Sequence, residues 1–500
     1  MTTINTNIGA LSAQATMTRV NMETSTSMER LSSGLRINSA ADDAAGMAIS
    51  EKMTAQIKGL SQAVRNATDG KNLVDTTEGA HVEVSNMLQR LRELSVQSAN
   101  DTNTSSDRNN LAAEGTQLIT EINRVAKDTT FNGMKILDGS FTGKQLQIGA
   151  DAGQTINIDV DSAAATDIGA HTVSTEVNAF GGTAAAGSAA SEIAGGATLT
   201  VTGYAGSATV STSAGQSAKS LADAINSSSA STGVEAEAMS KAKLSGFSAA
   251  SDVTFEINGT SIGNVNISDT SDLRGLRDAI NTQAGQTGVS ATMGENNGEI
   301  ILTDSQGNDI ELTGYDTSVD DTTMTVTALE SDGVTAAGTP AVTMTDTTSA
   351  VTSAVITGQV EMTSTKGFSV GTDNAATDGT RHFGATANNS SLDSVAQIDL
   401  TTAAGASKAI KTIDVALQKI NQSRSDLGAV SNRLDSTISN LTNITVNVEA
   451  ARSGIRDADF AQESTSLARG KILSQAATAM LAQANSTVTI AIDAILLTKG

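Results

Sequence analysis

The sequence predicts an α+β multidomain protein. Long terminal α-helical coiled coils, together with a β-hairpin, enclose a β-rich middle insert. Apolar residues recur every three or four positions at both ends, and the middle is rich in Thr, Ser, Ala and Gly. Aromatic residues make up 2% of the 500 residues, so the helical ends must pack through Ile, Leu, Val, Met and Ala.

The strongest helical pattern lies between residues 410 and 448. Twelve positions step by three and four without a break, and nine of them are apolar, which is typical of a coiled-coil seam. At 1.5 Å per residue this helix is about 58 Å long. We expect that neither end of the chain buries its seam alone, so both ends should pack against copies of the same chain. The twelve positions are Ile410, Ile413, Leu417, Ile420, Arg424, Leu427, Ser431, Leu434, Ile438, Leu441, Thr445 and Val448.

The N-terminal region is predicted to contain three helices separated by polar breaks. Ser32–Gly34 offers a C-cap for the first helix, and the carboxylates of Asp42 and Asp43 suit the start of the second. Asp107 is expected to cap the third helix, which ends at Phe131–Gly133. The first helix has an apolar stripe at Ile4, Ile8, Leu11, Ala15, Thr18 and Met22, continued after a change of register by Met28, Leu31 and Leu35.

Two other segments carry β-type patterns. Leu146 and Ile148, followed by a turn and then Ile156 and Ile158, alternate with polar neighbours and predict a β-hairpin. The final stretch, Ser486–Gly500, is rich in β-branched residues, so its pattern is compatible with either a helix or a strand.

The middle of the chain, residues 176–401, contains an internal duplication. The segment LADAINSSSASTGVEA, which starts at Leu221, returns as LRDAINTQAGQTGVSA from Leu276, at an offset of 55 residues. We therefore expect repeated β-rich modules, each with a short helix at DAIN. A module repeated within a polar insert indicates that the insert provides mass and exposed surface and does not form a single reactive site.

The net charge of −23 is concentrated in this middle. Residues 1–140 carry 13 Lys and Arg against 16 Asp and Glu, residues 406–500 carry 10 against 8, and residues 141–405 carry 8 against 30. Near-neutral ends can pack against copies of themselves without strong repulsion. The acidic middle argues against nucleic acid as a partner.

The sequence offers no constellation for catalysis, a cofactor or a metal ion. There is no Cys, and the three histidines, His81, His171 and His382, are not paired at a helical spacing. Asp304–Asp309 resembles part of a calcium loop but lacks the carboxylate ladder, so a Gly turn between strands is the preferred interpretation. The sequence therefore predicts a structural protein and not an enzyme.

The first residues, MTTINTNIGALS, lack the basic and apolar segments of a secretory signal peptide. No run of about 18 apolar residues is present, so no membrane-spanning helix is expected. If the protein is exported, we expect a route that needs no cleaved signal.

Several blocks at both ends resemble bacterial flagellin. On the N-terminal side these are Met28–Ile49 (MERLSSGLRINSAADDAAGMAI), TTEGA from Thr76, QRLRELSVQSAN from Gln89 and TFNG from Thr130. On the C-terminal side they are GAVSNRL from Gly428, IRDADF from Ile455 and MLAQAN from Met480. The resemblance covers about half of the chain, and the blocks occur in the family's order. Ser486–Gly500 departs from the family's usual Gln/Asn-containing and Leu-rich tail.

This resemblance implies a subunit that self-assembles into the flagellar filament for swimming motility. Residues 1–45 with 455–500 would form inner-tube helices, residues 46–175 with 402–454 a helical shell with the β-hairpin, and residues 176–401 a surface-exposed insert of two modules. The implied assembly seam consists of Ile4, Ile8, Leu11, Leu31, Leu35, Ile413, Leu417, Leu434, Ile438, Leu441, Leu467 and Met480.

The resemblance also implies partners and a location. The subunit would form a homopolymer, bind a flagellar export chaperone and contact hook-associated junction and cap proteins. It would lie in the extracellular filament after passage through the flagellar export apparatus. The alternatives are a hook–filament junction protein, and a filament subunit whose insert binds glycans.

The segment QRLREL allows two interpretations. By pattern alone, its charges indicate a solvated helix face on which Arg90 pairs with Glu93. The resemblance implies instead that the host Toll-like receptor for flagellin recognises this segment, through Gln89, Arg90 and Leu94 together with Glu114 on the next helix.

Overall fold

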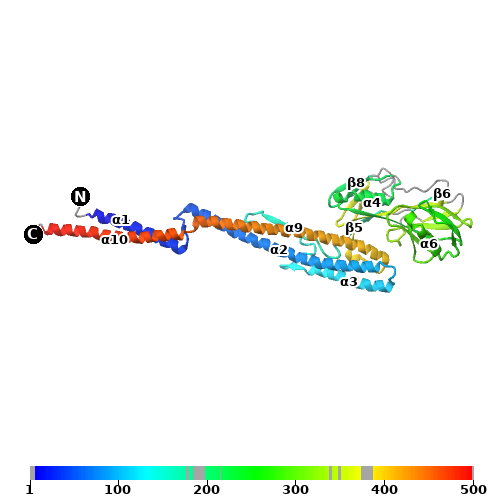
Figure 1. Ribbon diagram of the computed structural model, residues 1–500, viewed down its shortest axis with the longest axis horizontal. Helices are drawn as coiled ribbons and strands as arrows, with labels where there is room; N and C mark the ends of the chain where they lie inside the picture. Colours follow the sequence, from blue (N-terminus) through cyan, green and yellow to red (C-terminus); the bar gives the residue numbers. More distant parts are fainter. Residues whose placement is uncertain are drawn as a thin grey trace. The chain divides into compact units, whose positions relative to one another are not determined.

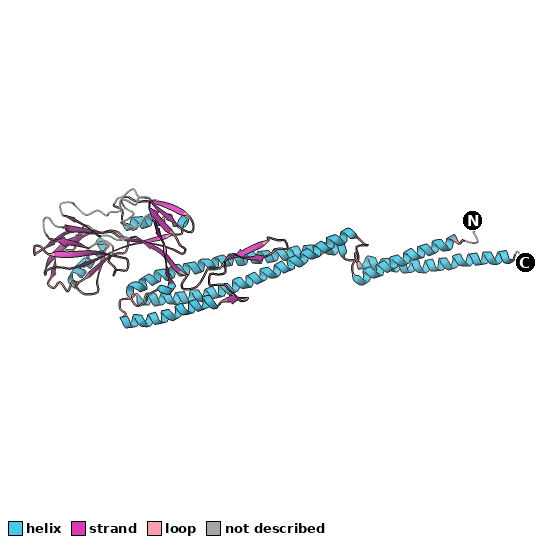
Figure 2. Cartoon of the chain, turned by 180° about the vertical axis from the view of Figure 1, so that it is seen from behind, coloured by secondary structure: helices cyan, strands magenta, loops and turns pink. Residues whose placement is uncertain are grey.

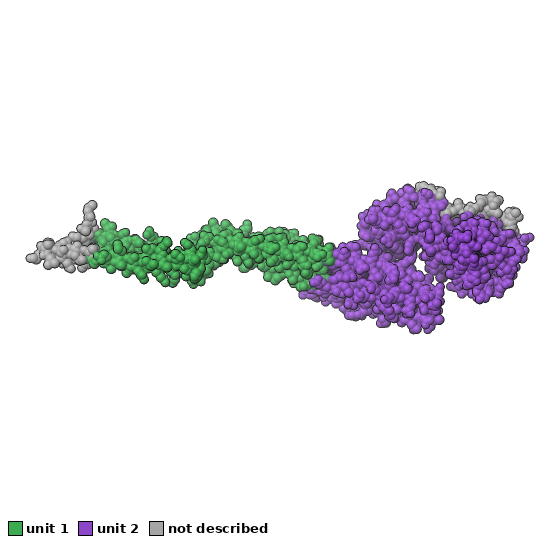
Figure 3. Space-filling view, viewed as in Figure 1, with its two compact units in different colours: residues 1–74, 143–158, 428–500 green, residues 75–142, 159–427 purple. Residues whose placement is uncertain are grey.

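The computed structural model describes residues 6–175, 179–183, 198–213, 215–336, 341–346, 351–372 and 387–497. The chain folds into two compact units (Figure 3). The first contains Met1–Val74, Gly143–Ile158 and Gly428–Gly500, and the second contains Asp75–Thr142 and Asp159–Leu427. The boundary between the units falls within two long helices, α2 (Ala44–Ser98) and α9 (Ala403–Arg456). The three-part division expected from the sequence stays a prediction.

The first unit is built from paired helices. Helix α1 (Ile8–Ser33) and helix α10 (Phe460–Leu497) lie side by side and run antiparallel (Figures 1 and 2). The side chain of Asn7 accepts a hydrogen bond from the backbone N–H of Ala10 and caps α1 at its start. Gly34, with φ of 72°, ends α1 in the left-handed conformation that favours glycine. The predicted break near Gly34 is confirmed, and the C-terminal tail is helical up to Leu497.

Helix α3 (Ser105–Asp128) begins differently from the expectation. Asp107 is not its cap, because it already lies in the first turn. Thr104 is the N-cap: its hydroxyl accepts from the N–H of Asp107, and the Asp107 carboxylate accepts from the N–H of Thr104. This reciprocal pair is a capping box, which satisfies two backbone donors at once.

The seam of α9 is covered within the single chain, so the expectation that it remains open without sister molecules is wrong. Ile413 and Leu434 are fully buried, and Leu441 packs against Leu60 and Ala63 of α2. Ile420 and Leu427 are also buried, and the other predicted positions, including Leu417 and Ile438, are half-buried. The reason is that α2 runs beside α9 and supplies the facing apolar stripe, as the cluster around Leu441 shows within the first unit.

The predicted hairpin is present as β3 (Lys144–Gln147) and β4 (Thr155–Ile158), and it packs on α2. A Cβ placed on Gly70 of α2 would come within 2.2 Å of the Cδ2 atom of Leu146. The amide of Asn66 also donates to the carbonyl oxygen of Gln147 at 2.9 Å. Glycine therefore lets the hairpin lie directly against the helix.

The second unit combines helices with the β-rich insert. Two short strands, β1 (Thr130–Phe131) and β2 (Met134–Lys135), follow α3. The insert contains β5 (Gly169–Ser174), β6 (Ala179–Thr183), β7 (Thr198–Thr202), β8 (Ser207–Ser211), β9 (Glu235–Ser245), β10 (Ser251–Ile257), β11 (Thr260–Ser261), β12 (Val265–Ile267), β13 (Ser290–Met293), β14 (Ile300–Asp304), β15 (Ile310–Thr317), β16 (Thr323–Leu329), β17 (Val342–Thr345), β18 (Val351–Ile356), β19 (Gln359–Ser364), β20 (Ser369–Thr372), β21 (Ala387–Asn389) and β22 (Ser391–Ser394). Its helices are α4 (Ala218–Asn226), α5 (Ser229–Thr232), α6 (Arg274–Thr282), α7 (Ala284–Thr287) and the 3-10 turn Val395–Gln397.

These strands form antiparallel sheets around two apolar cores. One sheet has the order β13-β14-β9-β19-β5-β22, with β16 and β17 attached through β9. A second has the order β11-β10-β15-β18-β6, and a third has the order β21-β20-β7-β8. One core contains Phe255 and Tyr315 and is covered by α6; the other contains Phe368 and is covered by α4.

The duplication seen in the sequence is a duplication of structure. The last Asn of each DAIN helix holds the strand that follows through the same two hydrogen bonds. Asn226 donates to the carbonyl and accepts from the N–H of Ala236, each at 2.8 Å, and Asn281 does the same with Ala291. The predicted short helix in each module is therefore confirmed, with an amide clamp that the sequence pattern did not reveal.

Candidate assembly surface

Helix α1 presents a stripe of small and partly polar residues to α10. Val20 and Ser27 are buried there, and their neighbours on the stripe are half-buried. The stripe steps by four and three residues, which is the spacing of a coiled-coil face. Its members are Ala13, Met17, Val20, Thr24, Ser27 and Leu31.

Helix α10 packs against α1 through a matching stripe, which includes a buried glycine. A Cβ on Gly470 would lie 2.4 Å from the Oγ1 atom of Thr24, so glycine allows the two helices to approach closely. Ala477 is buried on the same face. The members of the stripe are Glu463, Leu467, Gly470, Ser474, Ala477, Leu481 and Ala484.

Polar contacts fix the register of the two helices. The Asn7 amide donates to the carbonyl oxygen of Ala484 at 3.0 Å. At the other end of the pair, Arg30 donates to Glu463 at 3.2 Å. These contacts are distributed along the pair, so sliding one helix past the other would break them.

The opposite faces of both helices are apolar and uncovered. On α1, the predicted stripe is exposed from Ile8 to Met22, with Ile8 at 66%, Leu11 at 56% and Met22 at 65%. This stripe is offset by two residues from the stripe that packs on α10. At 100° per residue that offset is about 200°, which places the two stripes on opposite sides of the helix.

Helix α10 carries the same kind of uncovered surface. Phe460 is 70% exposed, Ile472 is 65% exposed and Met480 is 66% exposed. We call the exposed large apolar side chains of both helices the terminal outer face. It consists of Ile8, Leu11, Met22, Met28, Phe460, Ile472, Leu473 and Met480. A set of exposed large apolar side chains on paired helices marks an interaction surface.

The structure distributes the predicted assembly seam over three environments. Ile8, Leu11 and Met480 belong to the terminal outer face. Leu31, Leu35 and Leu467 are half-buried within the chain. Ile413, Leu417, Leu434, Ile438 and Leu441 lie along the covered face of α9. Ile4 lies outside the described residues.

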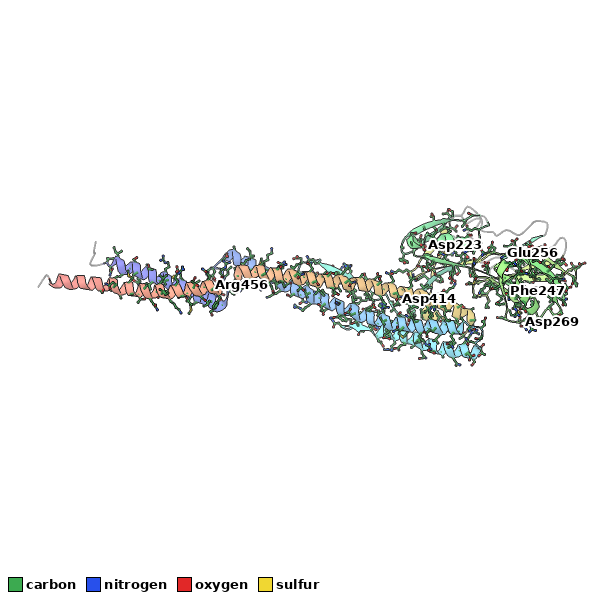
Figure 4. All side chains as sticks on the ribbon, viewed as in Figure 1. Asp223, Phe247, Glu256, Asp269, Asp414 and Arg456 are labelled. Carbon is green, nitrogen blue, oxygen red and sulfur yellow. The ribbon has the colours of Figure 1, made fainter. Side chains whose placement is uncertain are left out.

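A short backbone joint that the sequence did not reveal connects the helix pairs of the first unit. Leu35 forms an antiparallel bridge with Asp457, and the N–H of Arg36 donates to the carbonyl oxygen of Arg456 at 2.7 Å. The guanidinium of Arg36 donates to the carbonyl oxygen of Ile455 at 2.6 Å. Arg456, labelled in Figure 4, is the last residue of α9. The joint therefore ties the residues after α1 to those before α10.

The predicted receptor-binding residues occupy two environments in the second unit. Gln89 and Arg90 are exposed on α2, and the Arg90 guanidinium pairs with Glu93 at 2.8 Å and with Glu114 of α3 at 2.9 Å. Hydrogen bonds to Glu93 and Glu114 raise the pKa of Arg90. Both ion pairs leave the side chains of Gln89 and Arg90 exposed. The two interpretations of the QRLREL segment are thus compatible, because Arg90 is both paired and exposed.

Leu94 is a correction to the predicted receptor surface. It is 1% exposed and packs inside the helical part of the second unit, so it is not available for direct contact. The reason is its spacing: Leu94 follows Leu91 by three residues and Leu88 by six, which places all three on the buried face of α2. Leu94 is therefore a packing residue of the helix that carries Gln89 and Arg90.

Within the described residues, no three His, Asp or Glu side chains gather as a metal site would require. The Asp304 carboxylate accepts from the N–H of Gln306 at 2.7 Å in a turn that includes Gly307 at φ of 78°. The Gly-turn interpretation of this loop is therefore confirmed. In the same part of the chain, none of the helices has the length and apolarity needed to span a bilayer.

Comparisons with known protein families divide the chain into helical ends and a repeated middle, as the structure does. Residues 4–142 match the bacterial flagellin N-terminal helical region, and residues 410–490 match the bacterial flagellin C-terminal helical region. Residues 198–250 and 254–306 each match the flagellin hook IN motif, which corresponds to the two duplicated modules.

Curated flagellins align with nearly the whole chain. The chain is 37% identical over 486 residues to the B-type flagellin of Pseudomonas aeruginosa, with 97% of each chain covered. It is 35% identical over 508 residues to a flagellin of Salmonella rubislaw, with 96% of this chain and 97% of the relative covered. Among solved structures, FliC from Burkholderia pseudomallei is 20% identical, with a TM-score of 0.29, and the match covers 73% of this chain and 99% of that one.

Matched helical regions at both ends and a repeated motif between them define a structural protein of the bacterial flagellum. The chain belongs to the flagellin family, which provides the subunits of the flagellar filament.

Proposed function

We propose that this chain self-assembles into a filament for swimming by packing the terminal outer faces of neighbouring copies against one another. The observation that carries the proposal is the set of large apolar side chains left exposed on α1 and α10. Burying one such side chain contributes roughly 1.5–3 kcal/mol. Eight of them outweigh an association cost of about 4–15 kcal/mol only when most are buried together.

A pair of single substitutions tests this role. Ile472→Asp introduces a charge into the terminal outer face and is expected to prevent filament growth. Ser439→Asp introduces the same charge at an exposed position of α9, outside the terminal outer face, and should leave assembly intact. Sedimentation and electron microscopy of both proteins provide the measurement. Equal filament yield from the two variants would contradict the proposal.

Removal of residues 481–500 tests the contribution of the last part of α10. The truncated chain loses the contact of Asn7 with Ala484 and the end of the stripe that faces α1. We expect soluble monomer from the truncated protein and filaments from the full chain. Filaments from both proteins would show that this segment is dispensable for assembly.

We infer that the host Toll-like receptor for flagellin recognises the exposed patch formed by Gln89, Arg90 and Glu114. Support comes from the family resemblance and from the accessibility of these three side chains on adjacent helices. Arg90→Ala should weaken receptor signalling without stopping filament growth. Arg124→Ala removes an exposed arginine of α3 that is likewise paired with a glutamate, and it serves as the control. An unchanged dose response for Arg90→Ala would count against this assignment.

Family membership also supports the proposal that a flagellar export chaperone, junction proteins and a cap protein handle the subunit, and that export involves no cleavage. Mass spectrometry of filaments sheared from cells tests the last point. The expected N-terminal peptide begins at Met1 or Thr2. A peptide that begins well inside the first helix would refute export without cleavage.

A further inference from the structure

Methionine is the readily oxidised side chain of this protein. The chain contains 14 Met but no Cys and no Trp. Thioether sulfur reacts with two-electron oxidants to form the sulfoxide, and exposure determines which methionines react first. The positions of the methionines therefore decide where oxidation acts.

Three exposed methionines belong to the terminal outer face, two on α1 and one on α10. Met22 is 65% exposed, Met28 is 53% exposed, and Met480 of the partner helix is 66% exposed. In contrast, Met324 and Met344 are fully buried in the core of the insert. Methionine sulfur is therefore accessible on the surface through which copies are proposed to meet, and it is inaccessible in the core of the insert.

We propose that Met22, Met28 and Met480 form an oxidation site that switches assembly off in the free subunit and is shielded in the filament. This inference rests on the proposed assembly role of the terminal outer face. The oxidants are peroxides and hypohalous acids. A sulfur lone pair attacks one oxygen of hydrogen peroxide, the O–O bond breaks and hydroxide leaves. The hydroxide takes the proton from the oxygen now bound to sulfur, so that the thioether is oxidised to the sulfoxide and the peroxide is reduced to water.

The physical effect follows from polarity. A sulfoxide oxygen is a strong hydrogen-bond acceptor, and water satisfies it in the free subunit. Assembly would remove that water from an apolar contact and leave the acceptor without a donor. The fold of the subunit is unaffected because the three side chains do not contribute to its interior. We therefore expect the critical concentration for assembly to rise about tenfold or more.

The first experiment treats the full-length free subunit and the assembled filament with the same dose of hydrogen peroxide. Peptide mass spectrometry should show sulfoxide at Met22, Met28 and Met480 in the free subunit and little at Met324 and Met344. In the filament, the three sites should become protected. Met134, which is 44% exposed on β2 outside the terminal helices, reports whether the oxidant reached the filament.

The second experiment measures assembly of the oxidised subunit by sedimentation. The triple variant Met22→Leu, Met28→Leu and Met480→Leu keeps the apolar character and similar volume of the surface, and it should assemble normally before and after peroxide. Met134→Leu is the control and should remain sensitive. Treatment of the oxidised wild-type subunit with methionine sulfoxide reductases should restore assembly.

Three outcomes would contradict the proposal, and they distinguish its failure from that of the assembly surface. If oxidised wild-type protein assembles as well as untreated protein, the oxidation switch is refuted while the proposed assembly surface stands. If filaments form but Met22, Met28 and Met480 oxidise in them as fast as in free subunits, the surface is not buried, and both proposals fail. Loss of assembly in the peroxide-treated triple variant would place the sensitive site elsewhere and overturn the assignment.

Discussion

His81 is a buried neutral histidine whose protonation should weaken the helical part of the second unit in acid. It is 1% exposed on α2, its Nε2 atom lies 3.4 Å from the Ser423 hydroxyl of α9, and its Nδ1 atom has no hydrogen-bond partner among the described residues. Burial lowers the pKa of His81 from 6.5 to about 4. Glu78 and Asp161 oppose the shift and Arg424 adds to it, so desolvation is the dominant cause.

The sign of the effect follows from linkage. The unfolded chain binds a proton at His81 below pH 6.5, whereas the folded chain stays neutral until about pH 4. The contribution of His81 to stability is therefore complete above pH 6.5 and declines as the pH falls toward 4. At 1.36 kcal/mol per pKa unit, the loss is about 2 kcal/mol at pH 5 and about 3 kcal/mol near pH 4.

The perturbation is His81→Gln, which removes the titrating group. We expect the variant to lose less stability than the wild type between pH 7 and pH 5, by about 2 kcal/mol. The quantity compared is the change in unfolding free energy between pH 7 and pH 5, because the packing cost of the substitution is the same at both pH values. Hydrogen exchange of α2 peptides in the full chain gives the local unfolding free energy. His171→Gln is the control, since this half-buried histidine is less desolvated.

An identical pH dependence in His81→Gln and wild type would refute the reasoning. So would an imidazole resonance of His81 that titrates near pH 6.5 in the folded protein, because the side chain would then be accessible to water.

The other predictions concern glycine and the amide clamps. Gly470→Ala should loosen the pairing of α1 with α10 by about 1–2 kcal/mol, because the new Cβ meets a Thr24 hydroxyl that is held by its bond to the Val20 carbonyl. Gly454→Ala in α9 meets no atom within 4 Å and should stabilise its helix by about 1 kcal/mol, so hydrogen exchange should change in opposite directions in the two variants. Asn281→Ala should destabilise its module by about 2 kcal/mol in thermal unfolding, because the backbone N–H and C=O of the buried Ala291 lose their partners; no change in melting would contradict the clamp.

Period and composition were sufficient to predict the helices, the hairpin and the duplicated modules. The stripe of α9 from Ile410 to Val448 is the covered face of that helix at every predicted position. Apolar periodicity identifies which side of a helix is buried when one partner helix lies beside it. It does not identify the partner helix, so the sequence pattern alone does not predict that α2 packs against α9.

The terminal helices show where that rule fails. The most apolar stripe of α1, which includes Ile8 and Leu11, is exposed in the single chain, and the less apolar stripe around Val20 and Ser27 is buried. The stripe of small residues packs against α10 because Gly470 permits a close approach of the two helices. Polar groups such as Asn7 also form hydrogen bonds across the pair. Neither the contact geometry nor the partner of Asn7 is encoded in a single-helix pattern.

The two opposite faces of α1 have a consequence for assembly. If one apolar stripe served both the contact with α10 and the contacts with sister molecules, each new contact would require the pair to open. Because the stripes differ by about 200° around the helix, copies can add to the outer face while the inner contact persists. The chain therefore needs large apolar residues on the outside, where a new interface must form, and small ones inside, where Thr24 and Gly470 set the spacing. On this reasoning, Gly470→Ala should impair assembly indirectly, through the geometry of the pair, and Ile472→Asp directly, through the interface itself.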